Sequence, residues 1–91
     1  MRDDRFEWDD RKAAANLRKH EVSFELARLV FDDPIAIDEL DDEPGEERWK
    51  RIGIARGRLL QIVYTHRGVR VRIISARKAD SHEQDLYFTE R

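Results

Sequence analysis

Residues 48–78 read RWKRIGIARGRLLQIVYTHRGVRVRIISARK, and this stretch decides the fold. Its three apolar segments are rich in β-branched residues. They are separated by Arg56-Gly57-Arg58 and by His66-Arg67-Gly68, which are sequences typical of tight turns. Consecutive strands joined by short turns pair with one another in an antiparallel meander. The sequence therefore predicts three neighbouring strands, over residues 49–55, 59–65 and 69–76.

The same stretch is strongly basic. Residues 48–79 contain no Asp or Glu, but they contain ten of the 18 Lys and Arg residues of the chain. The whole chain has a formal net charge of −2, so the acidic residues are concentrated elsewhere. Segregated charge produces a field that attracts a polyanion, and nucleic acid is the commonest polyanion in a cell. The sequence therefore predicts a sheet with an arginine-rich face that binds nucleic acid.

Length and composition limit the other possibilities. A chain of 91 residues is expected to form one domain, residues 1–91, with a thin core. The absence of Cys excludes disulfides and thiolate metal sites and fits a reducing cytoplasm. No apolar run approaches the roughly 18–20 residues of a membrane span, and the N-terminus lacks an apolar signal core. We therefore expect a cytoplasmic protein, whose 42% of charged residues fits a highly charged surface or a face covered by a charged partner.

The segments that flank the meander predict one short strand and three helices. Phe6 and Trp8 alternate with Glu7, as in an edge strand. Asp9 is suited to cap a helix over 10–20, and Ser23 a second helix that ends before Pro34. Residues 80 or 81 can cap a last helix over 82–87. The predicted fold class is α+β, with two N-terminal helices packed on an antiparallel sheet of about four strands and a short C-terminal helix.

An acidic run precedes the basic stretch. Seven of the ten residues 38–47 are acidic, and Pro44-Gly45 marks a turn within them. Such a run is typical of a solvated loop, although residues 35–38 can open a further strand. Its position next to the basic stretch also allows the run to shield the cationic face.

The available side chains suit RNA cleavage without a metal. The sequence has no phosphate-cradling glycine loop, no nucleophile elbow and no metal-ligand spacing. When the ribose 2′-OH attacks the adjacent phosphorus, the substrate supplies the nucleophile. The protein supplies a proton acceptor, a proton donor and cations that stabilise the phosphorane. We therefore expect no metal and no cofactor, and RNA rather than DNA as the substrate.

The residues with suitable chemistry fall into three groups. Arginine and lysine side chains can clamp phosphate, histidine has a pKa suited to proton transfer at neutral pH, and aromatic rings can stack on bases or pack in the core. Any single carboxylate among them can equally form an ordinary surface salt bridge, so the prediction rests on the group. The clamp candidates are Arg67, Arg72, Arg77 and Lys78; the proton-transfer candidates are His20, His66, Glu47, Glu83 and Tyr87; the rings are Trp49 and Tyr64.

Several strings resemble the BrnT family of toxins. They are Phe6-Glu-Trp-Asp9, Lys19-His20 followed by Val22-Ser-Phe24, and Ile74-Ser-Ala-Arg77-Lys-Ala79, in this order and spacing. The resemblance covers almost the whole chain. It implies a fold like that of RelE ribonucleases, RNA cleavage that arrests translation and growth, and neutralisation by a BrnA antitoxin with a ribbon-helix-helix DNA-binding domain. It also implies a 2:2 heterotetramer that represses its own operon.

The resemblance and the residue chemistry together give the expected site. Where the family has Lys-His-Gly-Val, this chain has Glu21 in place of Gly, so the helix end and the position of His20 can differ. A non-catalytic module that binds RNA or joins a repressor complex stays open as the alternative. The expected catalytic residues are Lys19, His20, Glu47, Arg67, Arg77 and Glu83, and the expected RNA-binding residues are Arg48, Trp49, Arg51, His66, Arg72, Lys78 and Tyr87.

Overall fold

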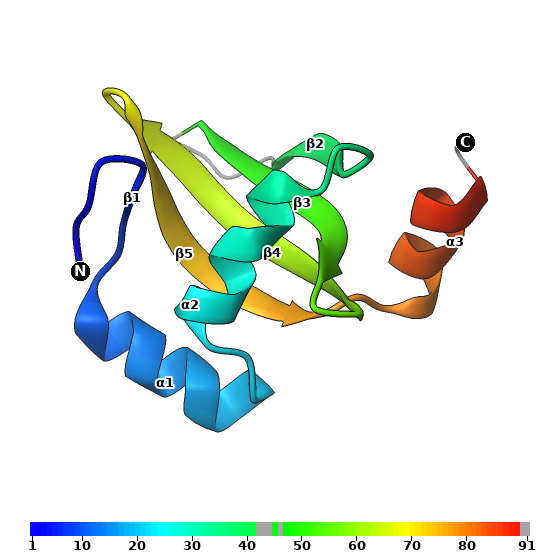
Figure 1. The fold of residues 1–91 in the computed structure, drawn as a ribbon, viewed down its shortest axis with the longest axis horizontal. Coiled ribbons are helices and arrows are strands. Elements are labelled where there is room, and N and C mark those ends of the chain that lie inside the picture. Colours follow the sequence, from blue (N-terminus) through cyan, green and yellow to red (C-terminus); the bar gives the residue numbers. More distant parts are fainter. Residues whose placement is uncertain (42–44, 46, 90–91) are drawn as a thin grey trace.

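The structure, a computed structural model, describes residues 1–41, 45 and 47–89. Its centre is one mixed sheet, one face of which is covered by the helical segment at residues 24–32, while the helix at residues 10–20 lies beside the strand at residues 70–78 (Figure 1). The third helix lies at the end of the sheet where β5 leads into it (Figure 1). In spatial order the five strands are β1 (Phe6–Glu7), β5 (Arg70–Lys78), β4 (Arg58–Arg67), β3 (Arg48–Ala55) and β2 (Ile37–Asp41).

The meander is confirmed, but the prediction of an antiparallel sheet of about four strands is wrong. β1 pairs with β5 in the parallel direction, with Phe6 opposite Val71 and Glu7 opposite Arg72. This pairing brings Phe6 next to Val71, which is 65 residues later in the sequence, and buries the ring of Phe6 in the core. A two-residue segment gives no local signal for such a partner.

The fifth strand comes from the acidic run, where a solvated loop was expected. Residues 37–41 form β2, the edge strand beside β3. Acidic side chains of β2 pair with basic side chains of β3. Asp38 forms a salt bridge with Arg51, and Asp41 Oδ1 lies 3.9 Å from Lys50 Nζ. Charge on an edge strand also opposes pairing with other chains. The acidic composition, which was interpreted as typical of a loop, therefore belongs in residues 37–41 to a charged edge strand. Residues 42–44 and 46 of the acidic run lie outside the described part of the chain.

The helices begin where the capping residues predict. The Asp9 carboxylate accepts hydrogen bonds from the backbone of Arg11 and Lys12, and the helix runs over Asp10–His20 as expected (α1). The Ser23 hydroxyl accepts one from the backbone of Leu26. The second helix is shorter than predicted, with one α-helical turn that tightens into a 3₁₀ segment. Its parts are α2 (Phe24–Ala27) and η1 (Arg28–Asp32), and the last helix is α3 (Ser81–Thr89).

The core lies between the sheet and the N-terminal helical segments. Phe24, Ala27 and Val30 are fully buried against Leu60 and Ile62 of β4. Gly53 lets η1 approach the sheet, because a Cβ there would lie 2.8 Å from the Val30 side chain. None of the helices among the described residues is long and apolar enough to cross a membrane.

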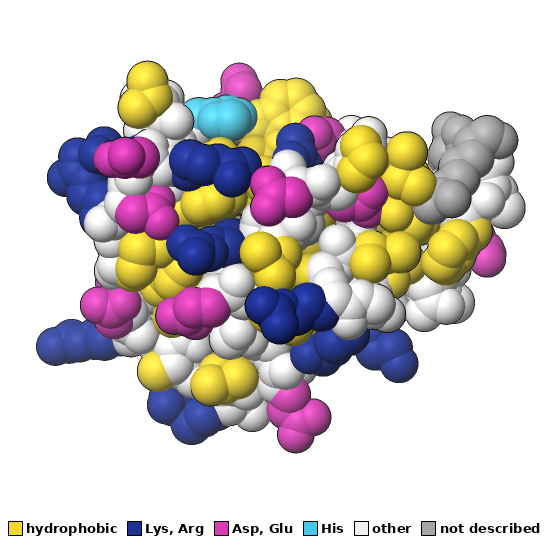
Figure 2. Space-filling model, in the orientation of Figure 1, with side chains coloured by type: hydrophobic (Ala, Val, Ile, Leu, Met, Phe, Trp, Pro, Cys, Tyr) yellow, Lys and Arg dark blue, Asp and Glu magenta, His cyan; other side chains and the backbone are white. Residues whose placement is uncertain are grey.

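The sheet has two different faces. Trp49, Arg51 and Gly53 of β3 point towards η1, as the contacts of Arg51 with Phe31 and of Gly53 with Val30 show. Figure 2 views this helix-covered face, on which basic and acidic side chains are intermixed. The intervening residues of β3 point to the opposite face, which we call the open face. The open face comprises the side chains of Glu7, Glu39, Asp41, Arg48, Lys50, Ile52, Gln61, Val63, Thr65, Arg67, Arg70, Arg72, Ser75 and Arg77.

Candidate active site

Cations from β3 and β5 flank a neutral strip of β4 on the open face. Val63 of β4 is opposite Lys50 on one side and Ser75 on the other. One row along, Gln61 is opposite Arg77; one row in the other direction, Thr65 is opposite Arg72. Arginines and a lysine therefore border a row of uncharged side chains, of which Gln61 and Thr65 are buried and Val63 is partly exposed. The bordering cations are the groups suited to contact a phosphate chain.

A β-bulge places Arg72 and Arg77 on the same face. Because they are five residues apart, simple alternation along β5 would put them on opposite faces. The register shifts at Val63/Tyr64, where Tyr64 is opposite Ile73 but Val63 is opposite Ser75. The extra residue in β5, Ile74, reverses the alternation beyond it, so both guanidinium groups reach the open face.

Arg72 is held by Glu7 of the neighbouring parallel strand. Its Nη1 donates to Glu7 Oε2 over 2.7 Å, and both side chains are more than two-thirds buried. This hydrogen bond is the main reason that the pKa of Glu7 lies below its usual range, and the charges of Arg72, Arg2 and Arg67 lower that pKa further. Arg67 therefore acts on the same carboxylate as Arg72. The parallel pairing of β1, absent from the predicted fold, builds this end of the site.

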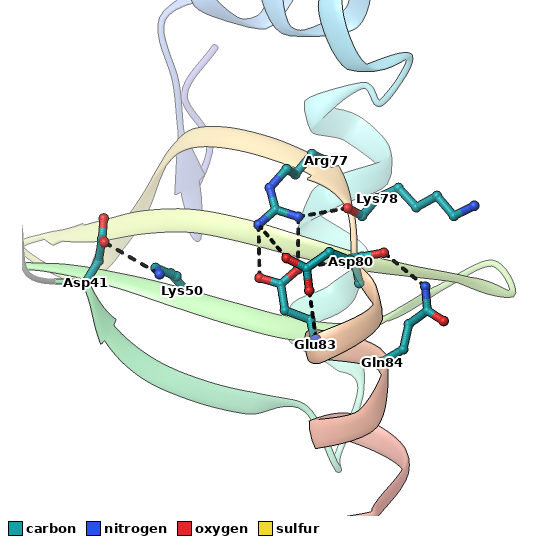
Figure 3. Close-up of polar contacts among 8 residues, drawn as sticks. Asp41, Lys50, Arg77, Lys78, Asp80, Glu83 and Gln84 are labelled. Atoms are coloured by element: carbon teal, nitrogen blue, oxygen red, sulfur yellow. Dashed lines mark hydrogen bonds and ion pairs between the residues drawn. The ribbon is translucent and has the colours of Figure 1, made fainter.

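Arg77 is held by Glu83 at the start of α3 (Figure 3). Its Nη1 and Nη2 donate to the two carboxylate oxygens over 2.9 and 3.0 Å, and Nη1 also donates to the carbonyl of Lys78. Glu83 in turn accepts from the backbone N–H of Asp80, whose carboxylate accepts from the Glu83 N–H. This reciprocal pair is a capping box. The Glu83 side chain is only 9% exposed, so Arg77 is fixed between the sheet and a helix end.

Lys50 is a functional candidate that the sequence analysis did not single out. Its Nζ lies 3.9 Å from Asp41 Oδ1, on the same face as Arg77 (Figure 3). Strict alternation in β3 predicts that Lys50 and Arg48 share a face. That pattern is the signal from which Lys50 could have been chosen.

Three expected RNA-binding residues lie on the helix-covered face instead. Trp49, Arg51 and His66 line one hollow there with Asp38 and Tyr64. Burial raises the pKa of Asp38, but the hydrogen bonds from Arg51 and Tyr64 outweigh it and hold that pKa below its usual range. Burial and the bond to Asp38 raise the pKa of Tyr64 to about 12. The structure therefore divides the expected site into a phosphate-binding face and an aromatic hollow.

The remaining expected residues lie around these two groups. Lys19 and His20 form the last turn of α1, where Glu21 adopts the left-handed conformation with φ 58°. Glu47 accepts a hydrogen bond from the indole of Trp49 over 3.3 Å, on the side of the hollow. Tyr87 is buried and donates to Asp33, and Lys78 is exposed at the end of β5.

The open face can bind and polarise a phosphodiester. Arg72 and Arg77 are each oriented by a carboxylate, which lowers the entropy cost of aligning them with phosphate. Among the described residues no three His, Asp or Glu side chains lie together as a metal site requires.

Comparison with protein families identifies the family of this chain. A family model described as "Ribonuclease toxin, BrnT, of type II toxin-antitoxin system" matches residues 8–83. No curated protein matches the chain. The matched segment contains the four strands β2 to β5, including Arg72 and Arg77, and it ends at Glu83, the ion-pair partner of Arg77.

Proposed function

The chain belongs to the BrnT family, the ribonuclease toxins of type II toxin–antitoxin systems, and we propose that it is an endoribonuclease that needs no metal. In the proposed reaction the ribose 2′-OH attacks the adjacent phosphorus and the 5′ oxygen leaves. The products are a 2′,3′-cyclic phosphate and a 5′-hydroxyl end. Cleavage of cellular RNA would inhibit translation and growth.

The pair of carboxylate-oriented arginines on the open face supports this proposal best. Arg77 has five N–H groups, of which three make hydrogen bonds to Glu83 and Lys78. Within the described part of the chain Arg72 makes one, to Glu7. Each guanidinium group therefore keeps donors for a phosphate oxygen. Because arginine stays protonated, the two can stabilise the additional negative charge of the phosphorane.

Proton transfer is proposed for four of the expected catalytic residues. The candidates are Lys19, His20, Glu47 and Glu83, with Arg67 as a further cation. Asn16 lies one helical turn before Lys19 and His20 in α1. Its side chain is hydrogen-bonded to the backbone of Ala76, the residue before Arg77, so this end of α1 is anchored beside Arg77. This anchoring favours Lys19 and His20 as the groups that approach a phosphate held by Arg77. For Glu83, the bidentate pair favours an additional task, to hold Arg77 in its orientation.

As a member of a toxin–antitoxin family, the protein has an antitoxin as its partner. We propose that this antitoxin is BrnA-like, with a ribbon-helix-helix domain, and that the two proteins form a 2:2 complex which binds operator DNA. The complex would act in the cytoplasm. An acidic antitoxin segment on the open face would compete with RNA for the same arginines.

Expression with and without the neighbouring small reading frame tests the proposal. We expect growth arrest with RNA breakdown, relieved by the neighbour. In vitro, RNA with a single 2′-deoxy nucleotide at the cut position should resist cleavage there, since its nucleophile is missing. Arg77→Ala should weaken both binding and cleavage, while Arg56→Ala, at the β3–β4 turn, is the matched control. Intact RNA and normal growth with a folded wild-type protein would refute the proposal.

One observation favours the alternative, a module that binds RNA without cutting it. His66, one of the two histidines expected to transfer protons, lies on the helix-covered face, away from Arg72 and Arg77. The variant Glu83→Gln discriminates, because Gln can keep the capping box but carries no charge. A catalyst would lose cleavage and retain RNA binding in this variant. A binding module would show no cleavage in any variant or in the wild type.

A further inference from the structure

A hollow of about 370 Å³ lies on the helix-covered face, opposite the proposed phosphate site. It is bounded by the end of η1, by β2 and by the ends of β3, β4 and β5 that lie near the β4–β5 turn. The mechanism proposed above makes no use of it. Its lining residues are Arg5, Phe31, Asp38, Trp49, Arg51, Tyr64, His66 and Val71.

Four aromatic rings from three elements form much of this hollow. The ring of Phe31 meets Tyr64 edge to face at 4.9 Å between centroids, and Tyr64 meets His66 in the same way at 5.7 Å. Trp49 is opposite Tyr64 in the register of β3 and β4. Tyr64 is buried, whereas His66 is exposed and Trp49 and Phe31 are partly exposed. The hollow therefore offers ring surfaces to solvent above a fixed aromatic floor.

Arg51 and Asp38 add a fixed polar edge to these rings. Arg51 donates to both oxygens of Asp38 over 2.8 and 2.7 Å, and the hydroxyl of Tyr64 donates to Asp38 over 2.9 Å. The guanidinium carbon lies 4.5 Å from the ring centre of Phe31. Arg51 has five N–H groups, of which Asp38 accepts two, and Asp38 Oδ2 accepts one hydrogen bond among the described residues. A donor and an acceptor in one rigid pair are thus available to a ligand.

The hollow and the open face adjoin each other around the β4–β5 hairpin. In β4, His66 lies in the hollow and its neighbours Thr65 and Arg67 lie on the open face. In β5, Val71 lies in the hollow and the next residue, Arg72, lies on the open face. Arg5 lies at the rim of the hollow. Cations therefore border the path from the hollow to Arg72, and a single RNA strand can follow it.

We propose that this hollow binds one base of single-stranded RNA while the neighbouring phosphates lie on the open face. The proposal rests on the proposed ribonuclease function and assigns it a base-binding subsite. Single-stranded RNA is recognised by stacking of splayed bases on aromatic rings and arginine planes, with hydrogen bonds to the base edges. Every base has both a donor and an acceptor on its pairing edge, which the Arg51–Asp38 pair complements.

Binding of uncleavable RNA tests this subsite. The 91-residue chain is titrated with a 2′-O-methyl RNA oligonucleotide and with copies that carry one abasic nucleotide at each position in turn. In the wild type, one abasic position should weaken binding roughly tenfold, the loss expected for one base–aromatic stack. In the His66→Ala and Trp49→Leu variants, an abasic nucleotide at that position should no longer weaken binding, because these variants already lack the ring on which the base stacks. His66 is exposed, so its variant keeps the fold; urea unfolding checks both.

Phe88→Leu is the matched control, since Phe88 is an aromatic residue with 58% exposure that lies outside the hollow. It should show the same abasic profile as the wild type. If the His66→Ala and Trp49→Leu variants lose affinity at the same abasic position as the wild type, the base-binding subsite is refuted, whereas the proposed ribonuclease function is not affected. Hollow variants that bind RNA normally but lose antitoxin binding would overturn the subsite too, and would make the hollow a protein contact. A wild type that binds no RNA would refute both proposals.

Discussion

The side-chain amide of Asn16 makes with Ala76 both hydrogen bonds that a neighbouring strand would make. Asn16 Nδ2 donates to the Ala76 carbonyl over 2.8 Å, and the Ala76 N–H donates to Asn16 Oδ1 over 3.1 Å. Among the described residues β1 is opposite Val71 and Arg72 of β5, and the Asn16 amide bonds the same edge of β5 further along, at Ala76. The same Nδ2 also donates to the carbonyl of Val22, and Asn16 is buried. One residue thus joins α1, the chain before α2, and the strand that carries Arg77.

Replacement of Asn16 by Ala should lower the free energy of unfolding by about 3 kcal/mol. The change leaves one buried N–H and two buried carbonyls without partners, and each such loss costs roughly 1–3 kcal/mol, with partial compensation by water. Urea unfolding measures the loss. Lys12→Ala, an exposed change in the same helix, should stay within about 0.5 kcal/mol of the wild type. A loss for Asn16→Ala no larger than that would show that water replaces the amide.

Glu21→Gly should raise the free energy of unfolding by about 0.5–1 kcal/mol. Glu21 ends α1 with φ 58° and ψ 33°, a conformation that costs a residue with a Cβ roughly 1–2 kcal/mol and costs Gly little. Part of the gain is lost because Gly has more freedom in the unfolded chain. The backbone at His20 should not change. Glu21→Ala is the control: it keeps the Cβ and should show no gain, so equal stabilisation by Ala would contradict the explanation.

Tyr64 should titrate about two pH units later than an ordinary tyrosine, since its pKa is raised to about 12 from 10.0. The neutral hydroxyl is favoured in the folded state by burial and by the bond to Asp38. Its contribution to stability is therefore complete below pH 10 and is lost as the pH rises towards 12. Tyrosinate absorbance measures the step, which Tyr64→Phe should remove. Asp38→Asn should move it to lower pH, and an unchanged step would exclude the role of the carboxylate.

Arg72→Ala should weaken binding of single-stranded RNA and reduce its dependence on salt. Removal of one phosphate contact lowers the slope of log K against log salt concentration by about 0.7. Affinities measured across a salt series give the slope. Arg56→Ala removes the same charge at the β3–β4 turn and should leave the slope near the wild-type value. Equal changes in both variants would indicate a diffuse charge effect instead of a contact at Arg72.

Local signals in the sequence predicted the elements that local contacts stabilise. The turn at Arg56-Gly57 has positive φ at both residues, which suits a tight hairpin, and the caps Asp9 and Ser23 begin helices as expected. Strict alternation along β3 places Trp49 and Arg51 on one face and Arg48 and Lys50 on the other, although the expected RNA-binding set combined Arg48 with Trp49 and Arg51. In each case the residues that interact lie within one turn or one strand of each other.

The candidate site was predicted less completely than these elements. The sequence indicated arginine-rich chemistry on an open sheet, and the structure places Arg67, Arg72 and Arg77 on that face. It does not bring His66 to them, and it adds Lys50. Which residues share a face depends on register, and register is set by pairing between strands that are distant in the sequence.

By itself the sequence determined that a basic meander forms and that two N-terminal caps start helices on it. Only the tertiary structure decided that β1 joins as a parallel strand and brings Glu7 to Arg72. Only the tertiary structure, through the bulge opposite Val63/Tyr64, placed Arg77 on the same face as Arg72. The physical reason is that side-chain direction alternates with a period of two. One unpaired residue therefore reverses the face of every later side chain, and its position depends on how whole strands pack.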